Sequence, residues 1–190
     1  MRKIKVAVVG TGSISGLHIR AYMKNPNVEV YALCDINEEV LKKAGETYGI
    51  TRLYTDEAEM LKALPEIDAV SVCTWNSAHA SCSIMALNAG KDVLCEKPMA
   101  LNATEAQAML DAARKNNRKL MIGFVRRFGN DCDVMSDFIA SGTLGDIYYA
   151  KAKALRRRAV PTWGVFLNEF EQGGGPLIDI GTHALDLTLW

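Results

Sequence analysis

Residues 3–16 read KIKVAVVGTGSISG, and this stretch decides the fold. The apolar run over residues 4–9 has the length of a buried strand, and it stops at Gly10. Beyond Gly12 the apolar residues recur at helical spacing instead of strand spacing. The pattern therefore predicts a strand, a tight turn and a helix within the first two dozen residues.

A turn of this kind is where the pyrophosphate of a dinucleotide binds in a strand–helix–strand unit. Gly10 lacks a Cβ and can form the turn, while Gly12 lets the phosphate approach the backbone closely. Ser15 stands in place of the third glycine of G-x-G-x-x-G and is small enough for close packing of helix on strand. The alternative is an ordinary glycine-rich turn. The residues predicted to contact a cofactor here are Gly10, Thr11, Gly12, Ser13 and Ile14.

An acidic residue follows the second predicted strand, residues 28–34, at the position expected for a ribose ligand. Asp35 lies 23 residues beyond Gly12. Its carboxylate can accept hydrogen bonds from the 2′ and 3′ hydroxyls and would repel a 2′-phosphate. Neither of the next two residues is Arg or Lys, so we predict NAD as the cofactor and regard NADP as less favoured. The alternative, compatible role for Asp35 is to cap a helix over residues 37–48.

The first 124 residues alternate apolar strands with amphipathic helices. Strands are predicted at 4–9, 28–34, 51–54, 69–74, 92–95 and 119–124, and helices at 37–48, 57–64, 77–88 and 102–115. Near-continuous apolar strands between helices indicate a parallel sheet that is covered on both faces. Right-handed crossovers then give an α/β fold with a doubly wound parallel Rossmann sheet, which we assign to a domain of residues 1–124.

The pattern changes after Phe124. A helix is predicted at 131–141, a strand at 147–154, an irregular segment at 156–175, and a final helix from Pro176 to the end. The strand has no evident partner, and a lone strand is not stable. We interpret residues 125–190 as the start of an incomplete α+β domain for substrate binding and oligomerisation. An uncovered strand edge and apolar surface would favour a homo-oligomer.

Composition argues against several classes of partner. The formal net charge is zero, which gives no electrostatic case for nucleic acid or an anionic membrane. No apolar run reaches the ~20 residues that span a bilayer, and the N-terminus enters a strand directly instead of a cleavable signal. We therefore expect a cytoplasmic protein.

The five cysteines form no C-x-x-C pair, and the three histidines lie far from any cysteine pair, so no metal site is predicted. Cys34, Cys73 and Cys95 end predicted strands and are interpreted as small apolar residues in a reducing compartment.

Three polar clusters follow predicted strands or lie near the end of the chain. The first, Thr74, Trp75, Asn76 and His79, could reach a nicotinamide or its ribose. Trp75 could wall the nicotinamide or pack on the fold as a loop aromatic.

The second cluster is Glu96, Lys97 and Pro98. The Lys97 ammonium could bind a substrate hydroxyl and stabilise an alkoxide as hydride leaves, or it could be an ordinary exposed lysine at a strand end. Pro98 leaves a cis Lys97–Pro98 bond open.

The third cluster is Asp179 and His183, four residues apart on a predicted helix. His183 suits a general base for a hydroxyl proton, and Asp179 could bind a neighbouring hydroxyl or orient the imidazole. The alternative is a surface pair. Further candidate substrate contacts are Arg127, beside Arg126, the arginines at 156–158, and Trp163. His18 is interpreted as a packed or surface histidine, and Asp186 as a structural partner.

These motifs together resemble the Gfo/Idh/MocA family, which includes glucose–fructose oxidoreductase and inositol dehydrogenase. The matching segments are GTGSISGLH (10–18), Asp35, TWNSAH (74–79), CEKP (95–98), GFVRRF (123–128) and GGGPLIDIGTHALD (173–186). The EKP and D-x-x-x-H motifs are more specific than the glycine turn. Two departures are Trp75, where the family usually has proline, and a chain that stops inside the helix of His183, so most of the C-terminal sheet is expected to be missing.

The resemblance implies an NAD(P)-binding Rossmann domain and a C-terminal α/β domain whose open sheet builds a dimer or tetramer. It implies hydride transfer between a sugar or cyclitol hydroxyl carbon and nicotinamide. Lys97 and His183 would then be the catalytic pair, Asp179 a substrate ligand, and Glu96 with Lys97 part of the cofactor contact. Two alternatives stay open: a non-catalytic NAD-binding module, and a regulator that senses NAD or a sugar.

Overall fold

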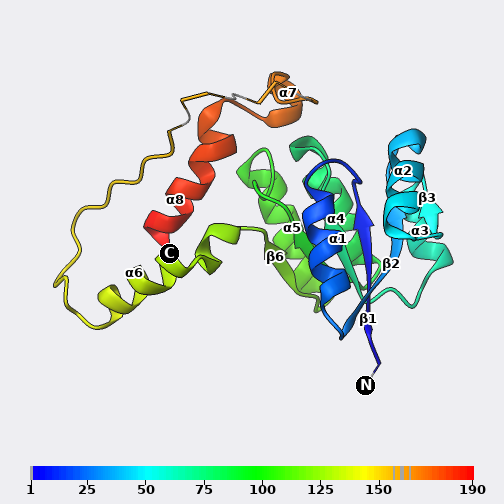
Figure 1. Ribbon diagram of the computed structural model, residues 1–190, viewed down its shortest axis with the longest axis horizontal. Coiled ribbons are helices and arrows are strands. Elements are labelled where there is room, and N and C mark those ends of the chain that lie inside the picture. The colour runs from blue at the N-terminus through cyan, green and yellow to red at the C-terminus, as the bar shows by residue number, and fades with distance from the viewer. Residues whose placement is uncertain (1, 156, 159–160, 163) are drawn as a thin grey trace. The chain divides into compact units, whose positions relative to one another are not determined.

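The computed structural model describes residues 2–155, 157–158, 161–162 and 164–190. The chain divides into two compact units, Met1–Ile122 and Gly123–Trp190, whose elements are labelled in Figure 1.

The first unit is built on six strands that pair in parallel, in the order β3-β2-β1-β4-β5-β6. The strands are β1 (Ile4–Val9), β2 (Val28–Cys34), β3 (Leu53–Tyr54), β4 (Ala69–Val72), β5 (Asp92–Cys95) and β6 (Leu120–Ile122). The predicted doubly wound parallel sheet is confirmed. Because β1 pairs with both β2 and β4, the chain reverses its direction of travel across the sheet there, and the crevice beyond β1 and β4 is the place where such folds bind ligands.

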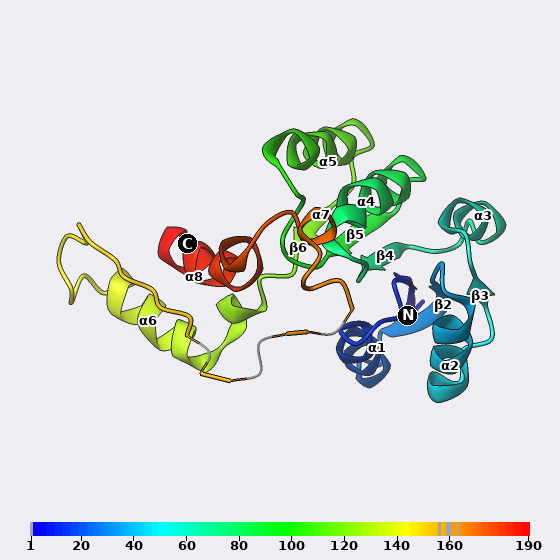
Figure 2. The ribbon, with the colours of Figure 1, turned by 90° about the horizontal axis from the view of Figure 1, so that it is seen from above.

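Helices cover both faces of this sheet. They are α1 (Ser15–Lys24), α2 (Glu38–Tyr48), α3 (Glu57–Ala63), α4 (His79–Asn88), which follows the short η1 (Asn76–Ala78), and α5 (Ala103–Lys115). Figure 2 shows α1 and α2 on one side of the strands, with α3, α4 and α5 on the other. Two apolar clusters result, one containing Ile19 and Leu33, the other containing Met60, Leu87 and Met109.

Local sequence signals fix the helix ends. The side chain of Asn37 accepts hydrogen bonds from the N–H groups of Glu39 and Val40, so Asn37 caps α2, and Asp35 does not. Asn102 caps α5 in the same way.

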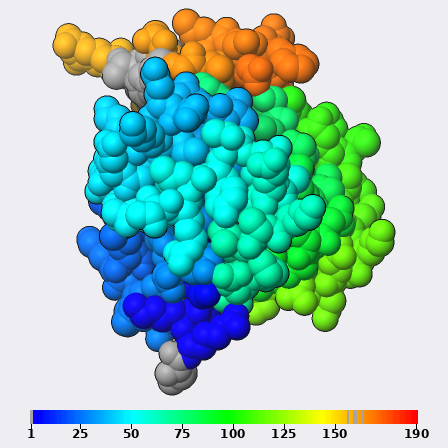
Figure 3. Space-filling view, turned by 90° about the vertical axis from the view of Figure 1, so that its right-hand side faces the viewer, coloured from blue at the N-terminus to red at the C-terminus, as the bar shows by residue number. Residues whose placement is uncertain are grey.

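The two-residue strand β3 is one edge of the sheet, and Figure 3 shows residues 45–65, in cyan, forming a continuous surface on that side.

Three cysteines meet the expectation drawn from the sequence. Cys34, Cys73 and Cys95 are free and at most 4% exposed, at or just after the ends of β2, β4 and β5. They pack as small apolar residues.

The regular elements described in the second unit are all helical. It contains η2 (Val125–Phe128), α6 (Asn130–Ala140), α7 (Glu169–Gln172), the π-helical turn η3 (Leu177–Gly181) and α8 (Thr182–Leu189). The predicted helices at 131–141 and from Pro176 onward are confirmed within a few residues, although the second begins as a π turn.

The predicted strand at 147–154 is wrong. Residues 147–154 are all described and carry no regular secondary structure, and Tyr148 is 97% exposed. Alternating apolar residues form a strand only where a neighbouring strand can pair with them. Residues 147–154 therefore offer no strand edge through which the expected association could occur.

Across the described residues, none of the helices combines the length and the apolar character needed to cross a bilayer.

Candidate active site

The glycine turn follows β1 and lies against the backbone just after β4. Gly10 has φ +86°, and its N–H donates to the carbonyl of Cys34. A Cβ on Gly10 would lie 2.6 Å from the backbone carbonyl group of Cys73. Both the conformation and the space therefore require glycine at this position.

Open space lies on the other side of the turn. A Cβ on Gly12 would meet no atom within 4 Å. A groove of about 360 Å³ runs from residues 11–13 of the turn along α1 and α2, where Arg20 and Tyr48 line it. Ser15 is 1% exposed, and its hydroxyl donates to the Gly12 carbonyl at 2.7 Å, which fixes the turn against the helix. The N-cap residue of α1, Ile14, makes no side-chain cap, so no side chain at that position occupies the N–H groups at the start of the helix. These residues fit the pyrophosphate of a dinucleotide.

Asp35 is held in place by the turn itself. Its Oδ2 accepts hydrogen bonds from the Thr11 N–H at 2.6 Å and the Thr11 hydroxyl at 2.9 Å, while Oδ1 accepts the Asn37 N–H at 2.9 Å. The carboxylate is thus fixed beside the turn, where a ribose would lie in folds of this class. The sequence predicted Thr11 as a cofactor contact, and the structure shows its donors directed at Asp35.

The predicted cluster after β4 is joined to the loop after β5 by His79. The ring of His79 is 1% exposed, with Nδ1 2.6 Å from the Pro98 carbonyl oxygen and Nε2 3.3 Å from the Thr74 carbonyl oxygen. Burial lowers the pKa of His79, although the carbonyl oxygens that face its two ring nitrogens favour the charged form, so the ring is neutral. Its single N–H is at Nδ1, the nitrogen nearer to a carbonyl oxygen, and donates to Pro98. His79 thus positions two loops, while Trp75 beside it is 44% exposed.

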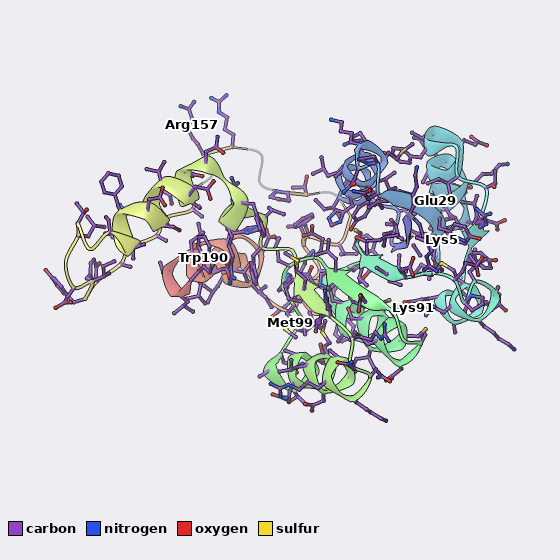
Figure 4. The ribbon with its side chains drawn as sticks, turned by 90° about the horizontal axis from the view of Figure 1, so that it is seen from below. Lys5, Glu29, Lys91, Met99, Arg157 and Trp190 are labelled. Atoms are coloured by element: carbon purple, nitrogen blue, oxygen red, sulfur yellow. The ribbon has the colours of Figure 1, made fainter. Side chains whose placement is uncertain are left out.

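Glu96 and Lys97 lie directly after β5. The Glu96 side chain is buried, and its Oε2 accepts the backbone N–H of Lys97 at 3.2 Å. Lys97 is half-buried, and the Lys97–Pro98 peptide bond is cis, as the sequence left open. Met99, labelled in Figure 4, belongs to the same loop.

The sequence did not predict the partner of Glu96. His18, on α1, has its Nε2 2.8 Å from Glu96 Oε1 and its Nδ1 2.9 Å from Ser71 Oγ. The Tyr22 hydroxyl also donates to Ser71 Oγ, at 3.1 Å. One signal was present: Ser71 is a polar residue inside an otherwise apolar strand, and a buried hydroxyl needs a hydrogen-bond partner.

The remaining candidates lie in the second unit. Asp179 is in η3 and His183 is in α8. Arg127 donates from Nε to Asp186 Oδ2 at 2.8 Å and from a terminal nitrogen to Oδ1, which makes a bidentate pair. Asp186 is therefore the structural partner that the sequence suggested, and part of the Arg127 fork is already engaged. Trp163 and Arg156 lie outside the described residues.

The structure thus brings the glycine turn, Asp35, the Thr74–His79 segment and the Glu96–Lys97 loop to one edge of a single parallel sheet. Asp179 and His183 belong to the other unit, so their pairing with Lys97 stays a prediction. A doubly wound sheet with this turn and this acidic residue defines the class of dinucleotide-binding α/β proteins.

Comparison with known families agrees with the fold. The oxidoreductase family GFO/IDH/MocA, described by its NAD-binding Rossmann fold, matches residues 4–124, and the GFO/IDH/MocA C-terminal domain matches residues 134–190. The chain belongs to the GFO/IDH/MocA family of oxidoreductases.

Individual relatives include sugar and cyclitol dehydrogenases. The chain is 40% identical over 188 residues to D-glucoside 3-dehydrogenase of Escherichia coli K12, covering 98% of this chain and 53% of the relative. It is 28% identical over 184 residues to myo-inositol 2-dehydrogenase of Thermotoga maritima, covering 97% and 53%. Among solved structures, a levoglucosan dehydrogenase in complex with NADH superposes with a TM-score of 0.86 at 26% identity, covering 98% and 53%. The chain spans about half the length of these relatives.

Proposed function

We propose that this chain is the part of an NAD-dependent oxidoreductase that binds the dinucleotide and begins the substrate site. The reaction is hydride transfer between a hydroxyl-bearing carbon of a sugar or cyclitol and nicotinamide. One observation carries the proposal: the open glycine turn, the fixed Asp35 carboxylate and the Lys97 loop lie at the same edge of one sheet. The dehydrogenases among the relatives support the substrate class.

The cofactor would lie across the β1–β4 crevice. The N–H groups at the start of α1 would bind the pyrophosphate, and Gly12 leaves room for it. Asp35 would accept hydrogen bonds from the adenosine ribose, and its negative charge disfavours the 2′-phosphate of NADP. Bound nicotinamide supplies the carbon that takes up hydride.

The protein's own groups would handle the substrate oxygen. The Lys97 ammonium would donate a hydrogen bond to that oxygen and stabilise the negative charge that develops on it. His183 would accept the hydroxyl proton at a ring nitrogen, and Asp179 would bind a neighbouring hydroxyl or orient the imidazole. Arg127 and Trp163 are further candidates for substrate contact.

The domain assignment remains part of this proposal. Residues 1–124 would form the NAD-binding domain, and residues 125–190 would begin the domain for substrate binding and oligomerisation. A homo-oligomer and a cytoplasmic location are predictions drawn from the sequence.

The proposal is tested by NADH formation from NAD⁺ and a panel of methyl glucosides and inositols. We expect the 190-residue chain to oxidise a member of the panel, and Lys97→Met to abolish this activity. The matched control is Lys119→Met, an exposed lysine just before β6, which should leave the rate unchanged. NAD⁺ binding without oxidation of any member would contradict hydride transfer and leave a dinucleotide-binding module.

A further inference from the structure

His18 and Glu96 form a buried pair that joins two parts of the proposed cofactor site. The two side chains are each 10% exposed, and Nε2 of His18 lies 2.8 Å from Oε1 of Glu96. His18 belongs to α1, whose first turn begins the proposed pyrophosphate site, and Glu96 immediately precedes Lys97. The residues are 78 positions apart in the sequence, so the contact connects α1 to the loop after β5.

The contacts of Glu96 extend the pair to the lysine. While Oε1 contacts His18, Oε2 accepts the backbone N–H of Lys97 at 3.2 Å. The carboxylate therefore holds the peptide group of Lys97 with one oxygen and α1 with the other. A long lysine side chain can be aimed only as well as its own backbone is fixed, so this contact bears on where the ammonium lies.

Charge reinforces the geometry. Burial alone would lower the pKa of His18, but hydrogen bonds and charges from Cys73 and Glu96 outweigh burial and raise it above its ordinary value of 6.5. For Glu96, burial raises the pKa, but the hydrogen bond and charge of His18 outweigh this and lower it. At neutral pH the pair is then an imidazolium and a carboxylate, and both ring nitrogens donate: Nε2 to Glu96 and Nδ1 to Ser71.

The surroundings contain few competing charges. Among the described residues, the titratable groups that act on the pair are Tyr22 on the same helix, Cys73 after β4, and Lys97 and His79 around the Glu96 loop. Of these, the Lys97 ammonium favours the charged form of Glu96, and His79 is neutral through burial. Glu96 and Cys73 are thus the two groups that raise the pKa of His18, and Glu96 is the one that contacts its Nε2.

We propose that His18 and Glu96 act as a positioning pair that fixes Lys97 and the nicotinamide half of the cofactor site to helix α1. The inference rests on the proposed function, because it assigns the pair a role in that same site. The proposal assigns different residues to the two halves of the cofactor. Asp35 and the turn would bind the adenosine half, and the His18–Glu96 pair would position the part of the site that binds the nicotinamide half. Neither residue would touch the transferred hydride.

The first test measures the protonation of His18 and the hydrogen exchange of the Lys97 amide in the 190-residue chain. Side-chain ¹⁵N NMR should show one of the three histidines with both ring nitrogens protonated at pH 8, and His18→Gln should remove that signal. Glu96→Gln should leave His18 neutral at the same pH. Backbone hydrogen exchange at the Lys97 amide should accelerate in His18→Gln. Unchanged exchange at the Lys97 amide in His18→Gln would overturn the positioning role whether or not the chain binds NAD.

The second test compares NAD⁺ with ADP-ribose, which lacks the nicotinamide, by titration calorimetry. His18→Gln and Glu96→Gln should each weaken NAD⁺ about tenfold, the scale of one charged hydrogen bond. The double variant should be no weaker than either single variant, because both remove the same interaction. ADP-ribose affinity should change less than about twofold, which also shows that the variants are folded.

Lys24→Gln, at the exposed end of α1, is the control and should leave both affinities unchanged. Equal weakening of both ligands in His18→Gln and Glu96→Gln would show a general structural role and overturn the inference. If the unmodified chain bound neither ligand, the proposed function would fail first, and the inference that rests on it would fail as well.

Discussion

The two units of the chain differ in what their apolar side chains contact. In the first unit, apolar residues from strands and helices form two buried clusters around a six-stranded sheet. In the second unit, Tyr148, Leu155, Phe170 and Leu189 are each more than 70% exposed. Amphipathic patterning therefore produces a packed core where each element has a neighbour to pack against, as it has in the first unit. The same patterning leaves exposed surface in the second unit.

The largest loss of stability is expected from a substitution at Gly10, in the turn between β1 and α1. Gly10→Ala places a Cβ 2.6 Å from the backbone of Cys73 and forces alanine to φ +86°. Urea denaturation should show a loss of roughly 2–4 kcal/mol in the unfolding free energy of this unit, from strain and steric overlap together.

Gly12, two residues further along the same turn, provides the matched comparison for Gly10. Gly12→Ala meets no atom within 4 Å, so the unfolding free energy should stay close to that of the unmodified chain. NAD⁺ should nevertheless bind less tightly, because the new methyl group fills the space for the phosphate. Equal destabilisation by both substitutions would mean that Gly10 is not specially constrained.

A smaller change in stability, which depends on pH, is expected from a substitution at Glu57, the first residue of α3. Among the described residues, neither carboxylate oxygen of Glu57 has an ordinary hydrogen-bond partner, and burial raises its pKa from 4.5 to about 7. A contact with the Cys82 thiol offsets only part of this shift. The folded state therefore favours the neutral acid. Its contribution to stability is complete below pH 4.5 and is lost as the pH rises through about 7.

Glu57→Gln removes that loss. At pH 8 the variant should be more stable than the unmodified chain by roughly 1–3 kcal/mol, and near pH 4.5 the two should be similar. Thermal unfolding at the two pH values measures the difference. Glu59→Gln, an exposed residue of the same helix, is the control. A variant that is no more stable at pH 8 would show that Glu57 is solvated in the folded state.

The smallest effect is expected in the second unit. Arg127→Met removes the bidentate contact between η2 and α8 through Asp186. Because Arg127 is partly exposed, the effect should be local: faster hydrogen exchange in α8, with the unfolding of the first unit unchanged. Arg126→Met is the control. Destabilisation of the first unit by Arg127→Met would show that the two units do not unfold independently.

The sequence was most informative where local signals and pairing agree. The turn after β1 and the apolar strands depend on neighbouring residues or on a period of two, so the first unit was predicted with small errors at the element ends. The strand at 147–154 was wrong because alternation says nothing about whether a partner strand is present. The contact between His18 and Glu96 could not be predicted, because it joins elements 78 positions apart that only the folded sheet brings together.

In the candidate site too, contacts between residues that are distant in the sequence could not be predicted. Asp35 could be placed from its spacing, but the Thr11 contacts that hold it follow from the geometry of the turn. Burial of His79 between two carbonyl groups likewise depends on how the loops after β4 and β5 meet.

The central claim is that the turn and Asp35 bind NAD, and calorimetric titration of the 190-residue chain with NAD⁺ tests it most directly. Asp35→Ala should weaken NAD⁺ by about 1–3 kcal/mol, the value of one or two hydrogen bonds to a charged group, and should reduce discrimination against NADP⁺. Asp111→Ala, an exposed carboxylate on α5, should bind NAD⁺ as the unmodified chain does. Equal NAD⁺ affinity in Asp35→Ala and the unmodified chain would contradict the account.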